Sequence, residues 1–295
     1  MIQSTNKILV PVDFSEQSLI ALEQSFNLAR EYNAEITLLH VIEDSGVLAK
    51  FFSTEQHDDM KKKVQSELDA LAADVEKKSK TTVNTLVAKG SVYEKINEVA
   101  ELINATMIVM GTNGVDGPKK RFIGSNALRV VRESSVPVIT IKGKHHRTGC
   151  KNIVLPLDLS KETREKVTKA IELSKLFDGA TVRVVSVLFT TDEFVVNRLT
   201  RQLGQVKAFL EKEHVECTAE IIKGIKGEET LAQNILEYAG KVEGDIILIM
   251  TQQEVDFTQY FIGSSAQEMI NHSTIPVLSI RPSPKKDTTV FTNPY

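Results

Sequence analysis

The sequence predicts an α/β protein made of two tandem, doubly wound parallel sheets of five strands each, in a three-layer α/β/α arrangement. Short runs that are apolar at nearly every position alternate with longer stretches whose apolar residues recur at helical spacing. Strands without a polar face are typical of parallel sheets, which helices cover on both sides. The entire pattern then occurs a second time in the chain of 295 residues.

In the first half, strands and helices are expected in alternation. The predicted strands are ILVPV, ITLLHV, the segment ending in VAKG, the IVM of ATMIVM, and VPVIT. Apolar residues three or four positions apart place the helices around residues 19–29, 64–75, 92–103 and 128–131. Ser15 lies shortly before the first of them and is expected to be its N-cap.

The second half repeats the strand-like segments of the first in the same order. KILVPVDFS returns as NIVLPLDLS, AEITLLHV as ATVRVVSV, VAKG as IIKG, ATMIVM as DIILIM, and SVPVITIK as TIPVLSIR. Self-similarity of this extent indicates a tandem duplication. We therefore expect one domain over residues 1–143 and a second over residues 151–282. A polar linker at 144–150 is expected to join them, and a loosely ordered tail at 283–295 to follow.

Bulk composition argues against several classes of protein. The 36 basic and 39 acidic residues give a net charge of −3, whereas nucleic-acid-binding proteins usually carry a basic excess. No apolar run reaches the length of a membrane span, and the N-terminus shows no secretory signal. Two cysteines in neither redox nor metal-ligand spacing agree with a reducing compartment. A cytoplasmic location is therefore expected, with no nucleic-acid or membrane partner.

The stretch GTNGVDGPKKRFIGSN, residues 111–126, is the main candidate for a binding site. It follows a predicted strand, so it is expected at the carboxyl edge of the sheet, where doubly wound folds bind ligands. Gly111 and Gly114 permit close approach of a ligand to the backbone. Gly124 and Ser125 open a predicted helix, and N–H groups at a helix start suit a phosphate. The cationic run 119–121 is interpreted as a solvated loop rather than a phosphate clamp.

The spacing Gly-x2-Gly-x9-Gly-Ser, with PVDFS after the first strand and LHV ending the second, resembles the ATP-binding type of the universal stress protein (UspA) family. The resemblance extends over nearly the whole chain, once per half. It implies a Rossmann-like fold of the adenine nucleotide alpha hydrolase type, in a domain that forms homodimers. It also implies that ATP, with or without Mg²⁺, lies across the sheet edge. The last strands, 136–142 and 277–281, would meet across a pseudo-twofold axis.

The resemblance also assigns residues to the nucleotide. Asp13 would hold the ribose or adenine side, and the backbone of Val41 would meet the adenine. Met110 and Gly111 would flank the sugar. The residues placed around the phosphates are Gly114, Gly124, Ser125 and Asn126, and the site is completed by Pro11 and Asn113.

Structural roles compete with two of these assignments. Asp13 is equally well explained as a tether for the helix that follows it, because its counterpart Asp158 is retained in the second half. Gly124 also has a counterpart, Gly263, so strand-to-helix packing explains it in either copy.

The two leading glycines differ between the halves. Met250 and Gln253 stand in the second half where Gly111 and Gly114 stand in the first. These glycines are therefore interpreted as dispensable for the fold and as functional. We expect the first half to bind the nucleotide and the second half to act as a built-in dimer partner.

The favoured function is a non-catalytic, stress-responsive regulator whose nucleotide state alters its conformation or its partners. Glycine-rich dinucleotide, Walker A and nucleophile-elbow motifs are absent from the sequence. His145 and His146 with Cys150, and His214 with Cys217, are only fragments of a metal site. No catalytic or metal-binding residue is therefore assigned. Slow ATP hydrolysis or self-phosphorylation, with Asp13 near Mg²⁺, stays open.

The alternative function is an interaction scaffold that binds no nucleotide. Apolar Leu48, Phe51 and Phe52 interrupt the polar stretch 43–59. They mark a contact with an unknown protein partner, a lid, or packing within a domain interface. A homodimer of the whole chain also stays open.

Overall fold

The computed structural model describes residues 6–43, 54–112, 123–143, 149–157, 163–253, 260–261 and 263–282. In the first half the strands are β1 (Asn6–Pro11), β2 (Ala34–Glu43), β3 (Val83–Gly90), β4 (Met107–Gly111) and β5 (Val138–Ile141). The helices there are α1 (Glu16–Glu31), α2 (Thr54–Ser79), α3 (Val92–Leu102) and α4 (Ser125–Glu133). Helices α1, α2 and α4 include all the residues over which helical spacing predicted them, and α3 ends one residue earlier than predicted.

The second half repeats these elements in the same order. Its main strands are β6 (Asn152–Pro156), β7 (Thr181–Leu188), β8 (Cys217–Lys223), β9 (Ile246–Met250) and β12 (Val277–Ile280). Its helices are α5 (Thr163–Leu176), α6 (Glu193–Lys212), α7 (Leu231–Lys241) and α8 (Ser264–His272). A short antiparallel pair, β10 (Gln252–Gln253) and β11 (Tyr260–Phe261), has no described counterpart in the first half.

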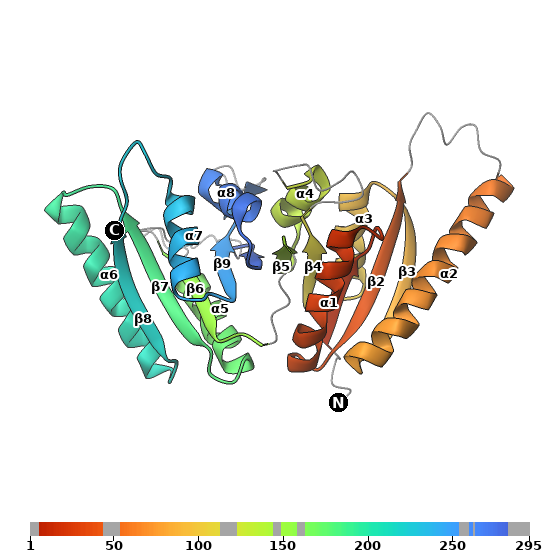
Figure 1. The fold of residues 1–295 in the computed structure, drawn as a ribbon, viewed down its shortest axis with the longest axis horizontal. Helices are drawn as coiled ribbons and strands as arrows, with labels where there is room; N and C mark the ends of the chain where they lie inside the picture. Colours follow the sequence, from red (N-terminus) through yellow and green to blue (C-terminus); the bar gives the residue numbers. More distant parts are fainter. Residues whose placement is uncertain are drawn as a thin grey trace, which may run out of the picture.

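The predicted α/β fold is confirmed, but the two sheets are joined into one. The strand order is β3-β2-β1-β4-β5-β12-β9-β6-β7-β8 (Figure 1). The equivalent strands of the second half therefore follow in the reverse order across the sheet. Within each half all neighbours are parallel, whereas β5 and β12 pair antiparallel. Ile139 pairs with Leu278, its own counterpart in the repeat. The pseudo-twofold axis therefore passes between these two residues, as the resemblance implied.

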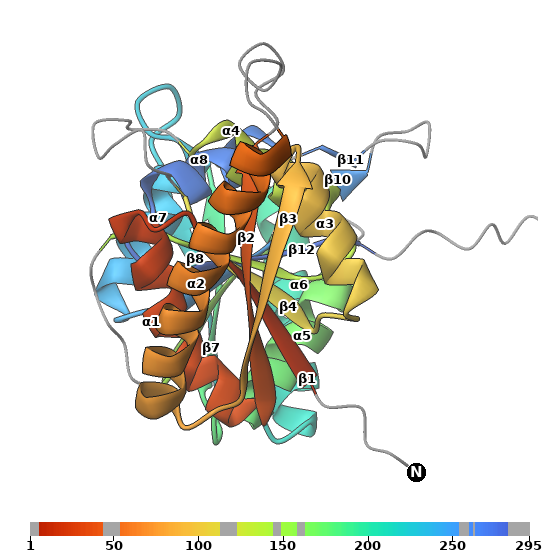
Figure 2. The same ribbon diagram turned by 90° about the vertical axis from the view of Figure 1, so that its right-hand side faces the viewer.

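Helices cover both faces of this sheet, which gives the three layers seen edge-on in Figure 2. One buried cluster unites α1, α2, α5 and α6 with one face, and a second unites α3, α4, α7 and α8 with the other. Alternate residues of a strand point to opposite faces, so Ile8 belongs to the first cluster and Leu9 to the second. Strands buried on both sides explain the apolar runs of the sequence.

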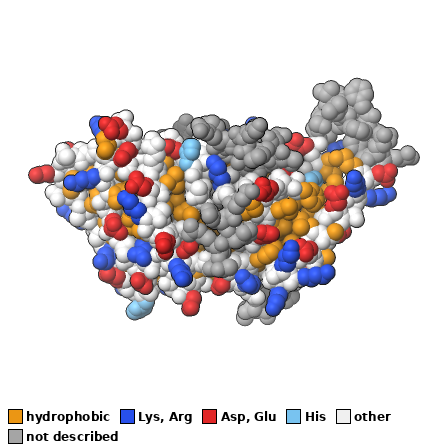
Figure 3. Space-filling model, in the orientation of Figure 1, with side chains coloured by type: hydrophobic (Ala, Val, Ile, Leu, Met, Phe, Trp, Pro, Cys, Tyr) orange, Lys and Arg blue, Asp and Glu red, His pale blue; other side chains and the backbone are white. Residues whose placement is uncertain are grey.

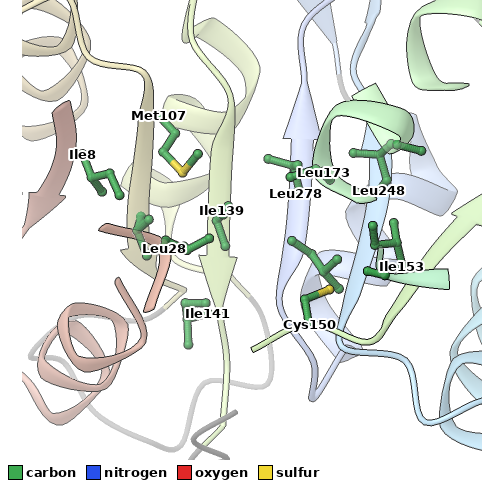
Figure 4. Close-up of a cluster of buried hydrophobic side chains, with 14 of the residues drawn as sticks. Ile8, Leu28, Met107, Ile139, Ile141, Cys150, Ile153, Leu173, Leu248 and Leu278 are labelled. Carbon is green, nitrogen blue, oxygen red and sulfur yellow. The ribbon is translucent and has the colours of Figure 1, made fainter. Parts of the chain in front are cut away.

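The core is continuous between the halves. Ile139 and Leu278 are each 1% exposed and lie on adjacent strands at the centre of Figure 4. The same cluster contains Ile8 of the first half and Ile153 of the second. The pairing of β5 with β12 therefore carries one hydrophobic core through both repeats.

The surface carries charges of both signs. Figure 3 shows acidic and basic side chains interspersed over both halves, in keeping with the nearly balanced composition. Within the described part of the chain, no helix combines the length and the apolar character needed to cross a membrane.

Candidate functional site

The candidate site lies where the chain changes direction across the first half of the sheet. From β1 the chain runs outward through β2 to β3, and then returns to place β4 and β5 on the other side of β1. The switch point is therefore between β1 and β4. Ligands of doubly wound sheets bind beyond the carboxyl ends of the strands at such a point. Pro11 and Gly111 are the last residues of these two strands.

Asp13 tethers the start of α1, as its structural interpretation proposed. Its Oδ1 accepts a hydrogen bond from the backbone N–H of Ser15 at 3.0 Å and another from the Ser15 hydroxyl. Ser15 is the N-cap of α1, and its Oγ accepts from the N–H of Ser18 at 3.2 Å. Phe14, between the two, has a φ of 60°. This backbone conformation turns the chain sharply from the strand into the helix.

Val41 offers its backbone to the same edge. The carbonyl of Leu39 accepts from the N–H of Val12 at 2.8 Å, so Leu39 directs its backbone groups towards β1. Alternate residues of a strand direct these groups to the same side, so those of Val41 also point there. Because Pro11 pairs with Leu39 and ends β1, Val41 lies beyond the last residue of its neighbour. This arrangement suits the backbone contact with a base that the resemblance assigns to Val41.

His40 is a residue of this edge that sequence reasoning missed. Its Nδ1 lies 2.8 Å from the Val12 carbonyl oxygen, and its ring centroid is 5.2 Å from that of Phe14. It therefore joins the end of β2 to the turn after β1. Its place in LHV was visible in the sequence, but nothing there indicated a contact across strands.

Gly111 corrects one interpretation of the sequence. A Cβ at this position would lie 2.9 Å from both the carbonyl carbon and the carbonyl oxygen of Gln17, in the first turn of α1. The glycine thus allows α1 to approach the end of β4, so it is not dispensable for packing in this half. The contact joins two backbones, which left no signal in the local sequence.

The neighbouring Met110 belongs to the hydrophobic core. Its side chain is buried in the cluster that contains Val130 of α4. Only its backbone reaches the sheet edge, so a contact with a sugar would have to be made by main-chain atoms.

The start of α4 faces this edge as expected. The N–H of Gly124 donates to the carbonyl of Thr112 at 2.7 Å, and a Cβ on Gly124 would lie 3.3 Å from that oxygen. Close packing of strand end and helix start therefore explains this glycine, as its structural interpretation proposed. As the N-cap, Gly124 brings no side chain to bond the first-turn N–H groups, and exposed Ser125 and half-buried Asn126 follow it. A helix start of this kind presents N–H donors and a partial positive charge.

Several predicted positions fall outside the described residues. They are Asn113, Gly114, the cationic run 119–121, Asp158, His145, His146, Leu48, Phe51 and Phe52. The structure brings together Pro11, Asp13, Val41, Gly111 and the start of α4 at one edge. Among the residues that the structure describes, no group of three or more His, Cys, Asp or Glu residues is placed to hold a metal ion.

The second half has a pocket of about 330 Å³ at the corresponding edge of its sheet. Met250, the counterpart of Gly111, lines it. Other lining residues include Leu157, Lys166, Val187, Ser264 and Met269. A methionine side chain thus lines a pocket at the position where the first half has a glycine.

Comparison with known proteins supplies the family context. The model of the universal stress protein family matches residues 4–142 and again residues 149–281. A universal stress protein of Methanocaldococcus jannaschii is 31% identical over 146 residues, covering 46% of this chain and 81% of the relative. One of Bacillus subtilis is also 31% identical over 146 residues, covering 46% of this chain and 99% of its own. These relatives therefore correspond to about one half of the present chain.

The solved structures include one that matches both halves at once. A universal stress protein from Archaeoglobus fulgidus superposes with a TM-score of 0.75 at 22% identity, covering 94% of this chain and 96% of its own. At this identity the likeness supports the two-repeat fold.

Proposed function

The chain belongs to the universal stress protein family, and from this premise we propose that it is a stress-response regulator that binds an adenine nucleotide, ATP, in its first half. The observation that carries the proposal is the convergence at one sheet edge of an open strand backbone and an uncapped helix start. Val41 presents its N–H and C=O beyond the end of β1, and α4 begins at Gly124 without a capping side chain. The first suits a base, and the second suits phosphates.

Gly111 allows α1 to lie close to the end of β4, because a Cβ there would be 2.9 Å from the backbone of Gln17. The start of α1 therefore lies beside the switch point at which we place the nucleotide. When bound, ATP would supply the charge and the conformational signal. The chain would hold the base by the Val41 backbone and the phosphates by the first turn of α4. Because Asp13 is engaged with Ser15, we assign it to positioning rather than to Mg²⁺.

We propose binding without efficient turnover. The sequence has neither a Walker A motif nor a nucleophile elbow. Multiple-turnover production of ADP that is lost in Asp13→Asn would make the protein an enzyme instead. The two cysteines are free thiols, which supports a cytoplasmic setting for this regulator.

The structure offers a matched pair of substitutions to test the site. Ser125 and Ser264 are the first helical residues after glycine N-caps, in α4 and α8 respectively. Aspartate suits this helical position, so neither Ser125→Asp nor Ser264→Asp should lower thermal stability. A negative charge in the first turn of α4 should repel phosphates and weaken ATP binding by about tenfold or more.

The assay is calorimetric titration with Mg-ATP of the intact protein and both variants. We expect one site in the parent, weakened by Ser125→Asp and unchanged by Ser264→Asp. The opposite pattern would move the nucleotide to the second half. A parent that binds no ATP, and carries no nucleotide through purification, would favour the interaction scaffold. Light scattering of the same samples would show whether whole chains form a homodimer.

A further inference from the structure

The second half of the chain contacts the exit of the candidate phosphate loop in the first half. The N–H of Ile123, directly before Gly124, donates a hydrogen bond of 2.7 Å to Oδ1 of Asn271 in α8. These residues are 148 positions apart, and Asn271 is 6% exposed. Removing one partner of a buried hydrogen bond is costly, because the other polar group is then left with neither a protein partner nor water.

Asn271 is also fixed by its backbone. Its carbonyl accepts from Nζ of Lys142, directly after β5, and burial lowers the pKa of that amine. Across the pseudo-twofold axis, Nη1 of Arg281 donates to the carbonyl of Glu133 at 3.4 Å. Each cation thus reaches the C-terminal end of a helix in the other half, where positive charge is stabilising. The crossing of β5 and β12 therefore holds α8 at a defined place beside the first half.

This support is asymmetric. Aligned on the glycines that precede α4 and α8, the counterpart of Asn271 in the first half is Arg132. Arg132 pairs instead with Glu133, its neighbour on α4, at 2.5 Å, and its side chain is 45% exposed. The second half therefore has an asparagine, Asn271, that contacts the proposed nucleotide site of the first half. The first half has an arginine, Arg132, at the equivalent position.

Two consecutive N–H groups are used to orient the start of α4. That of Ile123 bonds Asn271 in the second half, and that of Gly124 bonds Thr112 at the end of β4. Adjacent peptide groups held from two directions fix the plane of the chain as it enters the helix. The next N–H groups, from Ser125 onward, belong to the first turn of α4, which has no capping side chain.

We propose that Asn271 is a positioning residue for the nucleotide site of the first half, and that it sets the orientation of the phosphate-facing turn of α4 from the other repeat. This inference rests on the proposed function. The nucleotide site is then incomplete without the second half. Nucleotide binding is also coupled to the position of α8, because the coupling free energy between two sites is reciprocal.

The test is Asn271→Leu in the full-length protein, with Arg132→Ala as the matched control. Leucine keeps the side-chain volume but removes the acceptor. Titrations use ATP and adenosine as separate ligands. We expect Asn271→Leu to weaken ATP by about tenfold and adenosine by less than about twofold, because only the phosphates contact the turn. Arg132→Ala should change neither affinity.

The outcomes separate this inference from the function on which it rests. A parent that fails to bind ATP overturns both. A parent that binds ATP, with Asn271→Leu weakening ATP and adenosine equally or not at all, overturns the inference alone.

Should Asn271→Leu fail to fold, hydrogen exchange of the parent decides. ATP must then slow amide exchange in the peptide that contains the last turn of α8 as well as in the start of α4. Protection confined to the first half contradicts the proposal.

Discussion

Gly111→Ala tests whether this glycine serves packing, ligand binding or both. The new Cβ would lie 2.9 Å from the carbonyl carbon and oxygen of Gln17, about half an ångström short of the ordinary contact limit of 3.4 Å. Neither atom can move away as a flexible side chain would, because both belong to the backbone of α1. The end of β4 and the first turn of α1 must therefore separate.

The cost of this separation follows from its place in the fold. Overpacking by one methyl group in a close-packed region typically costs about 1–3 kcal/mol. The position lies between β4 and α1, which are in extensive contact, so relaxation elsewhere can relieve little of the strain. We expect a loss near the middle of that range. This is a large part of the roughly 5–15 kcal/mol by which a domain is stable.

Urea unfolding followed by circular dichroism measures the effect, with Gly204→Ala as control. Gly204 is an exposed residue inside α6, and a Cβ there would meet no atom within 4 Å. Alanine should therefore stabilise α6 by about 0.8–1 kcal/mol through helix propensity. The midpoint should fall for Gly111→Ala and rise for Gly204→Ala, with unchanged slopes. A Gly111→Ala protein that keeps its stability but loses ATP binding would refute the packing argument and leave a purely ligand-related role.

Two further predictions concern the stability of the fold. Burial raises the pKa of Tyr32 to about 12, and burial with a hydrogen bond to Glu220 raises the pKa of Tyr238 to about 12. In the unfolded chain both ionise near pH 10, so their contribution is complete below pH 10 and is lost as pH rises towards 12. The urea midpoint should fall over this range, and less steeply in Tyr238→Phe; an equal slope in the variant would contradict the assignment. In α7, Thr230 forms a capping box with Gln233, so Thr230→Ala should lower the free energy of unfolding by about 1 kcal/mol in the same assay. A change below a few tenths would show that solvent replaces the cap.

The elements of the fold could be predicted from sequence because their causes are local. Helical spacing of apolar residues located α1 to α4, and Ser15 was recognisable as the N-cap of α1. Continuous apolar runs located the strands. The repeat, combined with the family resemblance, also predicted that β5 and β12 meet, although it did not predict a single continuous core.

Features of the site that depend on distant contacts could not be predicted. The approach of Gly111 to Gln17 involves backbone atoms, so neither residue type predicts it. The bond between Ile123 and Asn271 joins the two repeats, and helical spacing treats Asn271 as an ordinary polar residue of α8. Alignment of the two repeats does show the difference, because Asn271 aligns with Arg132. Only the structure shows that Asn271 forms a hydrogen bond to the other repeat.

The junction at Ile139 and Leu278 has an evolutionary consequence. In a homodimer built around a twofold axis, one gene encodes both sides, so every substitution appears at two related places at once. Here the axis relates two stretches of a single gene that mutate independently. A change such as arginine to asparagine at the end of one helix can then be selected for its effect on the neighbouring repeat, without its mirror image being imposed on the other. Joining two copies in one chain thus allows the repeats to acquire different roles while both are inherited in a single gene.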